Sequence, residues 1–275
     1  MSLPAPGDLP AAGHHDETGA PDPAGPGYGS EPGIPGGPGS PGPDVTAGAP
    51  APVVLDRREG PYGEVVLRRR TEPDGTAVYE IIANGTFLMD TSDGRSERLL
   101  IDAARRELGE GVVGASVLIG GLGAGFSLAH AAADACWARI AVVEREQAVI
   151  DWHREGPLAS VSGAALADPR TVLLHAGLVE YLETSPDTYD ALCLDIDNGP
   201  GWTVTEENAG LYAPAGLAAC AARLNPGGVL AVWSARPSAD FEESLRNAGF
   251  HGVRTEEIPV ARGVPDVVHL AVRPA

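Results

Sequence analysis

The sequence contains no lysine, because all 19 of its basic residues are arginine. The chain therefore has no Schiff-base lysine, no P-loop lysine and no lysine general base, which excludes several classes of enzyme. Cysteine is scarce as well. Cys136, Cys193 and Cys220 lie far apart in apolar surroundings, without the close pairing typical of zinc sites or of a disulfide framework. We expect three buried free thiols and no metal site.

Positive charge is also in short supply, since 38 acidic residues outnumber 19 basic ones and give a formal net charge of −19. A protein that binds nucleic acid needs a basic surface, so the composition argues against a nucleic-acid partner. The first residues show no positive region followed by an apolar core, and no apolar run approaches the roughly 18 residues of a membrane span. We therefore expect a cytoplasmic protein that does not bind a membrane.

Three regions follow one another along the chain. Residues 1–52 are rich in proline and glycine and have almost no aliphatic clusters, which predicts a disordered tail. Residues 53–94 predict a small antiparallel β-domain, because turn sequences such as Asn84-Gly85 separate short β-rich runs. Those runs are Glu64–Arg70, Thr76–Ala83 and Thr86–Met89.

Residues 95–275 begin with a predicted helix, Arg95–Leu108, and continue with alternating strands and helices. Short apolar runs without alternation are typical of parallel strands that are covered on both faces. The predicted fold is α/β, with a doubly wound, mostly parallel Rossmann-like sheet and an antiparallel edge. The predicted strands are Ser116–Ile119, Ile140–Val143, Thr171–Leu174, Ala191–Leu194, Val229–Trp233, Val253–Ile258 and Val267–Val272, and the helices between them include Phe126–Ala135, Pro214–Leu224 and Ala239–Ala248.

A glycine-rich loop follows the first of these strands, with glycines at positions 120, 121, 123 and 125. Glycines there let the backbone turn sharply and approach a ligand, while the following helix offers its N-terminus. The dinucleotide pattern G-x-G-x-x-G is not met, which disfavours hydride transfer with NAD. The pattern G-x-G-x-G fits sheets that bind S-adenosylmethionine or a relative. Gly120, Gly121, Gly123 and Gly125 are therefore candidate ligand-binding residues.

Two carboxylates are predicted at strand ends. Glu144 ends the second strand, where an acidic side chain can accept hydrogen bonds from both ribose hydroxyls of an adenosine. Asp195 follows the fourth strand and would face the crevice of the sheet. The alternatives are that Glu144 is an ordinary surface carboxylate and that Asp195 or Asp197 caps the next segment.

Taken together, these motifs resemble the spermidine synthase-like polyamine aminopropyltransferases, within the class I adenosylmethionine-dependent fold. The resemblance covers about Glu64 to the C-terminus. It rests on the small β-domain, the Ile119–Gly125 loop, Glu144, Asp168-Pro169-Arg170, the Asp195 segment, Leu211-Tyr212 and Leu224-Asn225-Pro226-Gly227-Gly228-Val229.

The resemblance implies a transferase of polyamine biosynthesis that moves an aminopropyl group from decarboxylated S-adenosylmethionine to a small-molecule amine. It makes the glycine loop the site of the methionine-derived moiety, Glu144 the ribose ligand and Asp195 the catalytic acid/base, in contact with both substrates. It also implies a homodimer. The residues that would hold the amine are Glu97, Asp197, Asn198, Trp202 and Tyr212.

The chain departs from the family at several of these positions. Gly123 and Gly177 stand where the family has acidic residues, Asn198 replaces the second acid of its Asp-x-x-Asp-Pro motif, and Trp233 stands where it has glutamine. Arg95-Ser96-Glu97 is the closest equivalent of its Tyr-His-Glu. Three aromatic residues near predicted strand ends have two interpretations: they form the wall of a site for an organic ligand, or they pack in the core. They are Trp202, Tyr212 and Trp233. These departures keep three alternatives open: a different acceptor, a methyltransferase that uses intact S-adenosylmethionine, or a non-catalytic nucleoside-binding scaffold.

Overall fold

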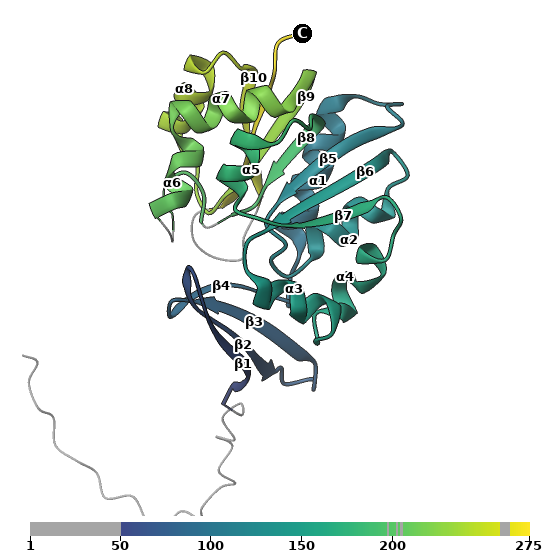
Figure 1. Cartoon of the computed structure of the whole chain (residues 1–275), viewed down its shortest axis with the longest axis vertical. Coiled ribbons are helices and arrows are strands. Elements are labelled where there is room, and N and C mark those ends of the chain that lie inside the picture. Colours follow the sequence, from purple (N-terminus) through teal and green to yellow (C-terminus); the bar gives the residue numbers. More distant parts are fainter. Residues whose placement is uncertain (1–50, 197, 202, 204–205, 259–264) are drawn as a thin grey trace, which may run out of the picture. The chain divides into compact units, whose positions relative to one another are not determined.

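The computed structural model describes residues 51–196, 198–201, 203, 206–258 and 265–275, and the statements below concern these residues. Two β-sheets follow one another along the chain (Figure 1). A four-stranded antiparallel sheet comes first, and a seven-stranded, mostly parallel sheet with helices on both faces forms the larger part. This arrangement confirms the predicted fold class.

The small sheet has the strand order β1-β2-β3-β4, with β1 at Val53–Gly60, β2 at Gly63–Thr71, β3 at Ala77–Ala83 and β4 at Thr86–Asp90. The predicted Asn84-Gly85 turn joins β3 to β4, and both residues have positive φ, 50° and 76°. Strand β1 was not among the predicted runs. Seven of its eight residues are exposed. Because neither face of the strand is buried, its sequence does not need the alternation of apolar and polar residues by which strands are predicted.

The large sheet has the strand order β10-β11-β9-β8-β5-β6-β7. Strands β5 to β9 run parallel, whereas β11 pairs antiparallel with both β9 and β10, as predicted for the edge. The strands are β5 (Ala115–Gly120), β6 (Trp137–Glu144), β7 (Thr171–His175), β8 (Tyr189–Leu194), β9 (Leu224–Ser234), β10 (His251–Ile258) and β11 (Asp266–Val272).

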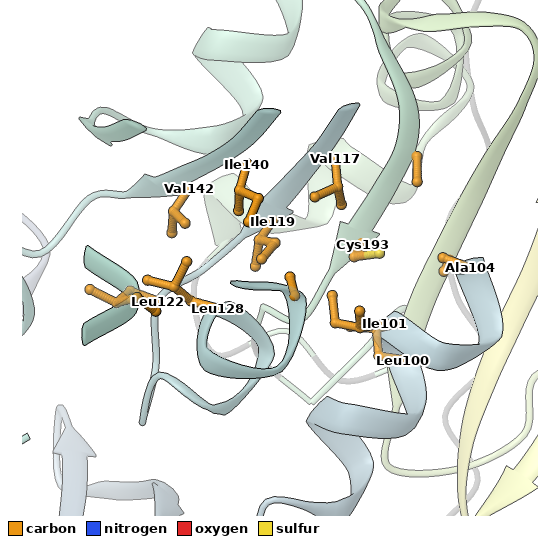
Figure 2. Close-up of a cluster of buried hydrophobic side chains, with 14 of the residues drawn as sticks. Leu100, Ile101, Ala104, Val117, Ile119, Leu122, Leu128, Ile140, Val142 and Cys193 are labelled. Carbon is orange, nitrogen blue, oxygen red and sulfur yellow. The ribbon is translucent and has the colours of Figure 1, made fainter. Parts of the chain in front are cut away.

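The helices cover both faces of this sheet (Figure 1). One face packs against α1 (Arg95–Leu108), α2 (Phe126–Ala133), α3 (Gln147–Arg154) and α4 (Ala159–Leu166), and the other against α5 (Leu178–Thr184), α6 (Glu206–Tyr212), α7 (Pro214–Arg223) and α8 (Ala239–Asn247). Figure 2 shows the first layer, in which Val117 and Ile119 of β5 meet Leu100 and Ile101 of α1. No helix in the described part of the chain is long and apolar enough to cross a membrane.

Several predicted boundaries differ from the observed ones by one to three residues, and the largest difference is at the start of β9. The run Asn225-Pro226-Gly227-Gly228 was expected to separate a helix from a strand that starts at Val229, but β9 already begins at Leu224. The reason is a backbone pairing with the C-terminal segment: Gly227 N–H donates to the carbonyl of Arg273, and Arg273 N–H donates to the carbonyl of Gly228. Helix α1, in contrast, begins at Arg95 and ends at Leu108, as predicted.

The strand order places a topological switch at β5. The chain leaves β5 toward β6 and β7 on one side, then crosses back to β8 and β9 on the other. In open α/β sheets, such a point leaves a crevice outside the carboxyl ends of the two central strands, and ligands bind there. The glycine loop after β5 and Asp195 after β8 lie at this crevice.

Candidate functional site

A cavity of about 420 Å³ lies at the carboxyl ends of β5, β6 and β8, with strands β3 and β4 of the small sheet contributing to its wall. This volume suits a drug-sized organic ligand. The wall is strongly acidic, because among the residues that the structure describes seven carboxylates line it and Arg145 is the one arginine that does. The carboxylates are Asp90, Asp93, Glu97, Glu144, Glu146, Asp195 and Asp266.

The glycine loop forms part of the floor of the cavity through Gly121 and Gly123. Gly121 is tightly packed: a Cβ there would lie 2.7 Å from the carbonyl oxygen of Asp195, and the residue has a φ of 92°. The same two segments are joined by a backbone hydrogen bond of 3.0 Å from Asp195 N–H to the carbonyl of Gly120. The loop and Asp195 are therefore fixed to each other before any ligand binds.

The two outer glycines of the loop do not line the cavity. A Cβ at Gly120 would lie 2.6 Å from the side chain of Leu178, and one at Gly125 would lie 2.8 Å from His153. These glycines are needed for close packing within the protein. Gly120 and Gly125 support the loop, whereas Gly121 and Gly123 face the ligand space.

Met89 of β4 occupies the space beside Gly123. Its sulfur lies 2.9 Å from the backbone nitrogen of Ala124, and a Cβ at Gly123 would lie 2.5 Å from that sulfur. Gly123 also has a φ of 49°, in the left-handed region. An acidic side chain, as the family has at this position, would not fit here without rearrangement, because Met89 fills the space that it would need.

Glu144 ends β6 and is buried, with 8% of its surface exposed. One carboxylate oxygen accepts a hydrogen bond of 2.9 Å from the N–H of Leu122 in the glycine loop, and the other accepts one of 2.8 Å from Glu146 N–H. A carboxylate has about four acceptor positions, so two remain for ligand hydroxyls. Glu144 lies on the cavity wall, and the alternative of an ordinary surface carboxylate is wrong.

Asp195 follows β8 and lines the cavity. Burial raises its pKa to about 8, and repulsion from Glu97 and then from Asp266 contributes to the rise. Burial also raises the pKa of Glu97, in the first turn of α1; the charges of Asp93 and Asp266 add to this rise, whereas the positive charge of Arg98 opposes it. Strong shifts of this kind concentrate at sites that bind ligands or move protons.

Asp266, the first residue of β11, was not predicted to belong to the site. Its carboxylate accepts a hydrogen bond of 2.9 Å from the hydroxyl of Ser96 in α1. We call Glu97, Asp195 and Asp266 the acidic triad; all three line the cavity. No sequence motif marks Asp266, because only the antiparallel return of β11 beside β9 brings it to the site.

Other predicted residues take different places. Asn198 and Tyr212 do not line the cavity; the Asn198 carbonyl accepts from Ala235 N–H, and the Tyr212 hydroxyl donates to the carbonyl of Ile196 over 3.4 Å. Asp197 and Trp202 lie outside the described residues. Trp233 lines the cavity, which agrees with the interpretation that it walls an organic ligand rather than belonging only to the core.

Within the described ranges, no group of three His, Cys, Asp or Glu side chains is arranged to hold a metal ion. Carboxylates on an enclosed wall that also contains apolar groups such as Val65, Ile81 and Leu178 suit an organic cation.

Comparison with solved structures identifies the fold. The chain is similar to a spermidine synthase in complex with the transition-state analogue AdoDATO (18% identity, 80% of this chain, 72% of that chain, TM-score 0.62). It is equally similar to the spermidine synthase from Thermotoga maritima (19% identity, 80% of this chain, 73% of that chain, TM-score 0.63). No family model matches the sequence, and no curated protein matches it. The chain has a spermidine synthase-like fold, as its motifs predicted.

Proposed function

We propose that the protein is an aminopropyltransferase that moves an aminopropyl group from decarboxylated S-adenosylmethionine to an amine acceptor. The observation that carries the proposal is the acidic triad in the cavity. Among the residues that the structure describes, Glu97, Asp195 and Asp266 form no ion pair with any arginine or histidine. The spermidine synthase-like fold supports the same reaction class.

The charges of the substrates complement this cavity. Decarboxylated S-adenosylmethionine carries a sulfonium and an ammonium group, and an alkylamine acceptor adds another ammonium. Intact S-adenosylmethionine also carries a carboxylate. Bringing that carboxylate into a space where the described part of the chain places seven carboxylates and one arginine costs electrostatic energy. The cavity therefore favours the decarboxylated donor over the intact one.

Glu144 and the glycine loop would bind the nucleoside part of the donor. Two acceptor positions of the Glu144 carboxylate remain for the ribose hydroxyls, and Gly121 and Gly123 of the loop line the same cavity. Because Glu144 also holds the loop through Leu122 N–H, one side chain would set the position of both the loop and the ribose.

Asp195 would serve as the proton acceptor. An alkylammonium has a pKa near ~10 and becomes a nucleophile only after it loses a proton. The neutral nitrogen then forms a bond to the carbon beside sulfur, the carbon–sulfur bond breaks, and its electron pair stays on sulfur in methylthioadenosine. A pKa of about 8 makes Asp195 a stronger base than an ordinary aspartate, which suits it to take the acceptor's proton. The remaining contribution of the site is alignment of the two substrates.

The test is calorimetric titration of the full chain with the decarboxylated and the intact donor, followed by analysis of the products after addition of mixed amines. The proposal predicts tighter binding of the decarboxylated form and release of methylthioadenosine. Preference for the intact form with release of adenosylhomocysteine would replace it with methyl transfer. Failure to bind either donor would leave a non-catalytic scaffold.

A further inference from the structure

Met89 places an oxidisable sulfur against the glycine loop. The residue belongs to β4, lines the cavity and is partly exposed. Its sulfur accepts a hydrogen bond of 2.9 Å from the backbone N–H of Ala124, which belongs to the loop. A thioether reacts with peroxides to give a sulfoxide, which is polar where the thioether was apolar. An oxygen added at Met89 would therefore arise at the contact between β4 and the loop.

The cysteine sulfurs are protected by comparison. Cys136, Cys193 and Cys220 are all buried. Burial raises the pKa of the three thiols, that of Cys136 to about 11 and that of Cys220 to about 12. Because peroxides react with the thiolate, these cysteines react slowly at neutral pH. Among the residues that the structure describes, Met89 is therefore the preferred target of a peroxide.

The glycine loop is fixed by contacts with other elements. Leu122 N–H donates to the Glu144 carboxylate of β6 over 2.9 Å, and Nε2 of His153 in α3 lies 2.8 Å from the carbonyl oxygen of Gly123. Both of these partner side chains are buried. Moving the loop away from β4 would break hydrogen bonds at buried groups, which is costly. The loop therefore has little freedom to accommodate a larger group at Met89.

The contact between strand and loop leaves no room for an added oxygen. The 2.9 Å between the Met89 sulfur and the Ala124 nitrogen is already a hydrogen-bond distance, and a Cβ at Gly123 would lie 2.5 Å from the same sulfur. A sulfoxide oxygen must therefore point into the cavity or push Met89 away from the loop. Strand β4 is the last strand of the small sheet, with β3 as its neighbour. Either response changes the space beside Gly123 that a ligand would occupy.

We propose that Met89 is a modification site: hydrogen peroxide oxidises its thioether, and the sulfoxide blocks nucleoside binding in the cavity. A lone pair of sulfur attacks one peroxide oxygen, the O–O bond breaks, and the second oxygen leaves as water after proton transfer. Sulfur loses two electrons and the peroxide gains them. A dithiol reductant, acting through methionine sulfoxide reductase, reverses the step by removing the oxygen as water and becoming a disulfide. The inference rests on the nucleoside binding that the proposed function requires.

The test compares the full chain before and after treatment with hydrogen peroxide. Mass spectrometry of proteolytic peptides locates the added oxygen, and calorimetry measures the affinity for methylthioadenosine. Oxidation of Met89 should lower this affinity at least about tenfold, because forcing extra atoms into a filled site is costly. Methionine sulfoxide reductase with a dithiol should restore the affinity. Saturating methylthioadenosine should slow the oxidation of Met89 and leave that of Met1 unchanged, because coupling between two events is reciprocal.

Met89→Leu is the matched control, since leucine has a similar volume and no sulfur. Each chain is its own reference, so any effect of the substitution on binding itself is removed. Peroxide should change the affinity of Met89→Leu by less than about twofold, although this variant retains Met1 and the three cysteines. A comparable loss in Met89→Leu, or a wild-type affinity that survives complete oxidation of Met89, would overturn the proposal. So would a Met89 that stays reduced while Met1 is oxidised.

Amide hydrogen exchange separates this proposal from the proposed function. Oxidation should speed exchange in residues 120–125 of the wild-type chain without ligand, and peroxide should cause no such change in Met89→Leu. If the untreated chain does not bind methylthioadenosine, the proposed function fails and exchange alone decides the role of Met89. Faster exchange would then keep Met89 as a modification site that acts on the loop, and unchanged exchange would refute it. Aminopropyl transfer that continues unchanged after complete oxidation of Met89 would establish the reaction and refute the modification site.

Discussion

The Nε2 atom of His153 lies 2.8 Å from the carbonyl oxygen of Gly123, so a buried histidine of α3 holds the glycine loop at the edge of the cavity. A carbonyl can only accept, and Nε2 must therefore carry the proton. In the neutral ring, Nδ1 then accepts from the hydroxyl of Ser162, 2.7 Å away. Only 1% of His153 is exposed, and burial lowers its pKa below the ordinary value.

This arrangement predicts how stability depends on pH. Because the folded pKa of His153 lies below 6.5, the unfolded chain binds more protons than the folded chain as pH falls through that value. The contribution of neutral His153 is fully present above about pH 6.5 and is lost at lower pH. We expect His153→Ala to cost on the order of 2–4 kcal/mol at pH 7.5 and less at pH 5.5. Denaturant unfolding at pH 7.5 and pH 5.5 measures the free energy of unfolding of wild type and variant, and His251→Ala, at an exposed histidine, is the control. An equal cost of His153→Ala at both pH values would contradict the prediction.

The position of Met89 predicts the result of restoring an acid to the glycine loop. Gly123→Asp should destabilise the protein by about 1–2 kcal/mol, because Gly123 has positive φ and a Cβ would meet the Met89 sulfur. Gly123→Ala carries the same backbone strain without the charge and is the control. Removing the contact with Met89→Ala should recover part of the stability lost in Gly123→Asp. Thermal unfolding of the single and double variants measures both effects, and a fully stable Gly123→Asp would refute the role given to Met89.

Glu144 is expected to determine affinity for ribose. Glu144→Gln should weaken the binding of methylthioadenosine by about 1–3 kcal/mol, because hydrogen bonds to a charged acceptor are stronger than those to a neutral one. Its neighbour Glu146 also lines the cavity and is partly buried, so Glu146→Gln is the matched control. Calorimetry with an analogue that lacks both ribose hydroxyls should show no difference between Glu144→Gln and wild type. A loss of the same size for that analogue would mean that Glu144 acts only through the loop.

The raised pKa of Asp195 predicts the pH profile of the reaction. If Asp195 accepts the proton, kcat/KM should rise as pH increases through about 8, where its carboxyl ionises. Glu97→Gln removes the larger of the two repulsions and should move this rise to lower pH. Asp195→Asn should reduce the rate at least about a hundredfold. A profile that does not move in Glu97→Gln would contradict the coupling of the two carboxyl groups.

The same shift predicts that Asp195 opposes folding at high pH. Its folded pKa exceeds the unfolded value of 3.8, so between these two pKa values the folded chain holds a proton that the unfolded chain has released; stability therefore falls as pH rises above 3.8, and the loss is complete above about 8. Asp195→Asn should therefore be more stable than wild type at pH 9, by at least about 1 kcal/mol. Denaturant unfolding at pH 6 and pH 9 tests the sign; a variant that is less stable at pH 9 would refute it.

Sequence patterns predict the fold and the strand-end residues of this site well. Glu144 and Asp195 follow apolar runs directly, and the carboxyl ends of parallel strands meet at one edge, so local sequence is enough to place them. Met89, Ser96 and Asp266 are different. Their positions depend on how β4 and β11 return to the glycine loop and to α1, which no local periodicity encodes.

The residues of the acidic triad are far apart in the chain, at positions 97, 195 and 266, and Asp266 belongs to the hairpin at the end of the sheet. Edge elements with a solvent-facing side open locally more readily than the central strands. Strand β10 is such an element, whereas β11 is buried and pairs with both β9 and β10; fraying at this end of the sheet would release Asp266, the first residue of β11, while the β5–β8 core stays folded. Binding of the amine would then be lost by partial unfolding. We expect this loss at a lower temperature or denaturant concentration than the loss of helix content, whereas nucleoside binding would persist until the core unfolds.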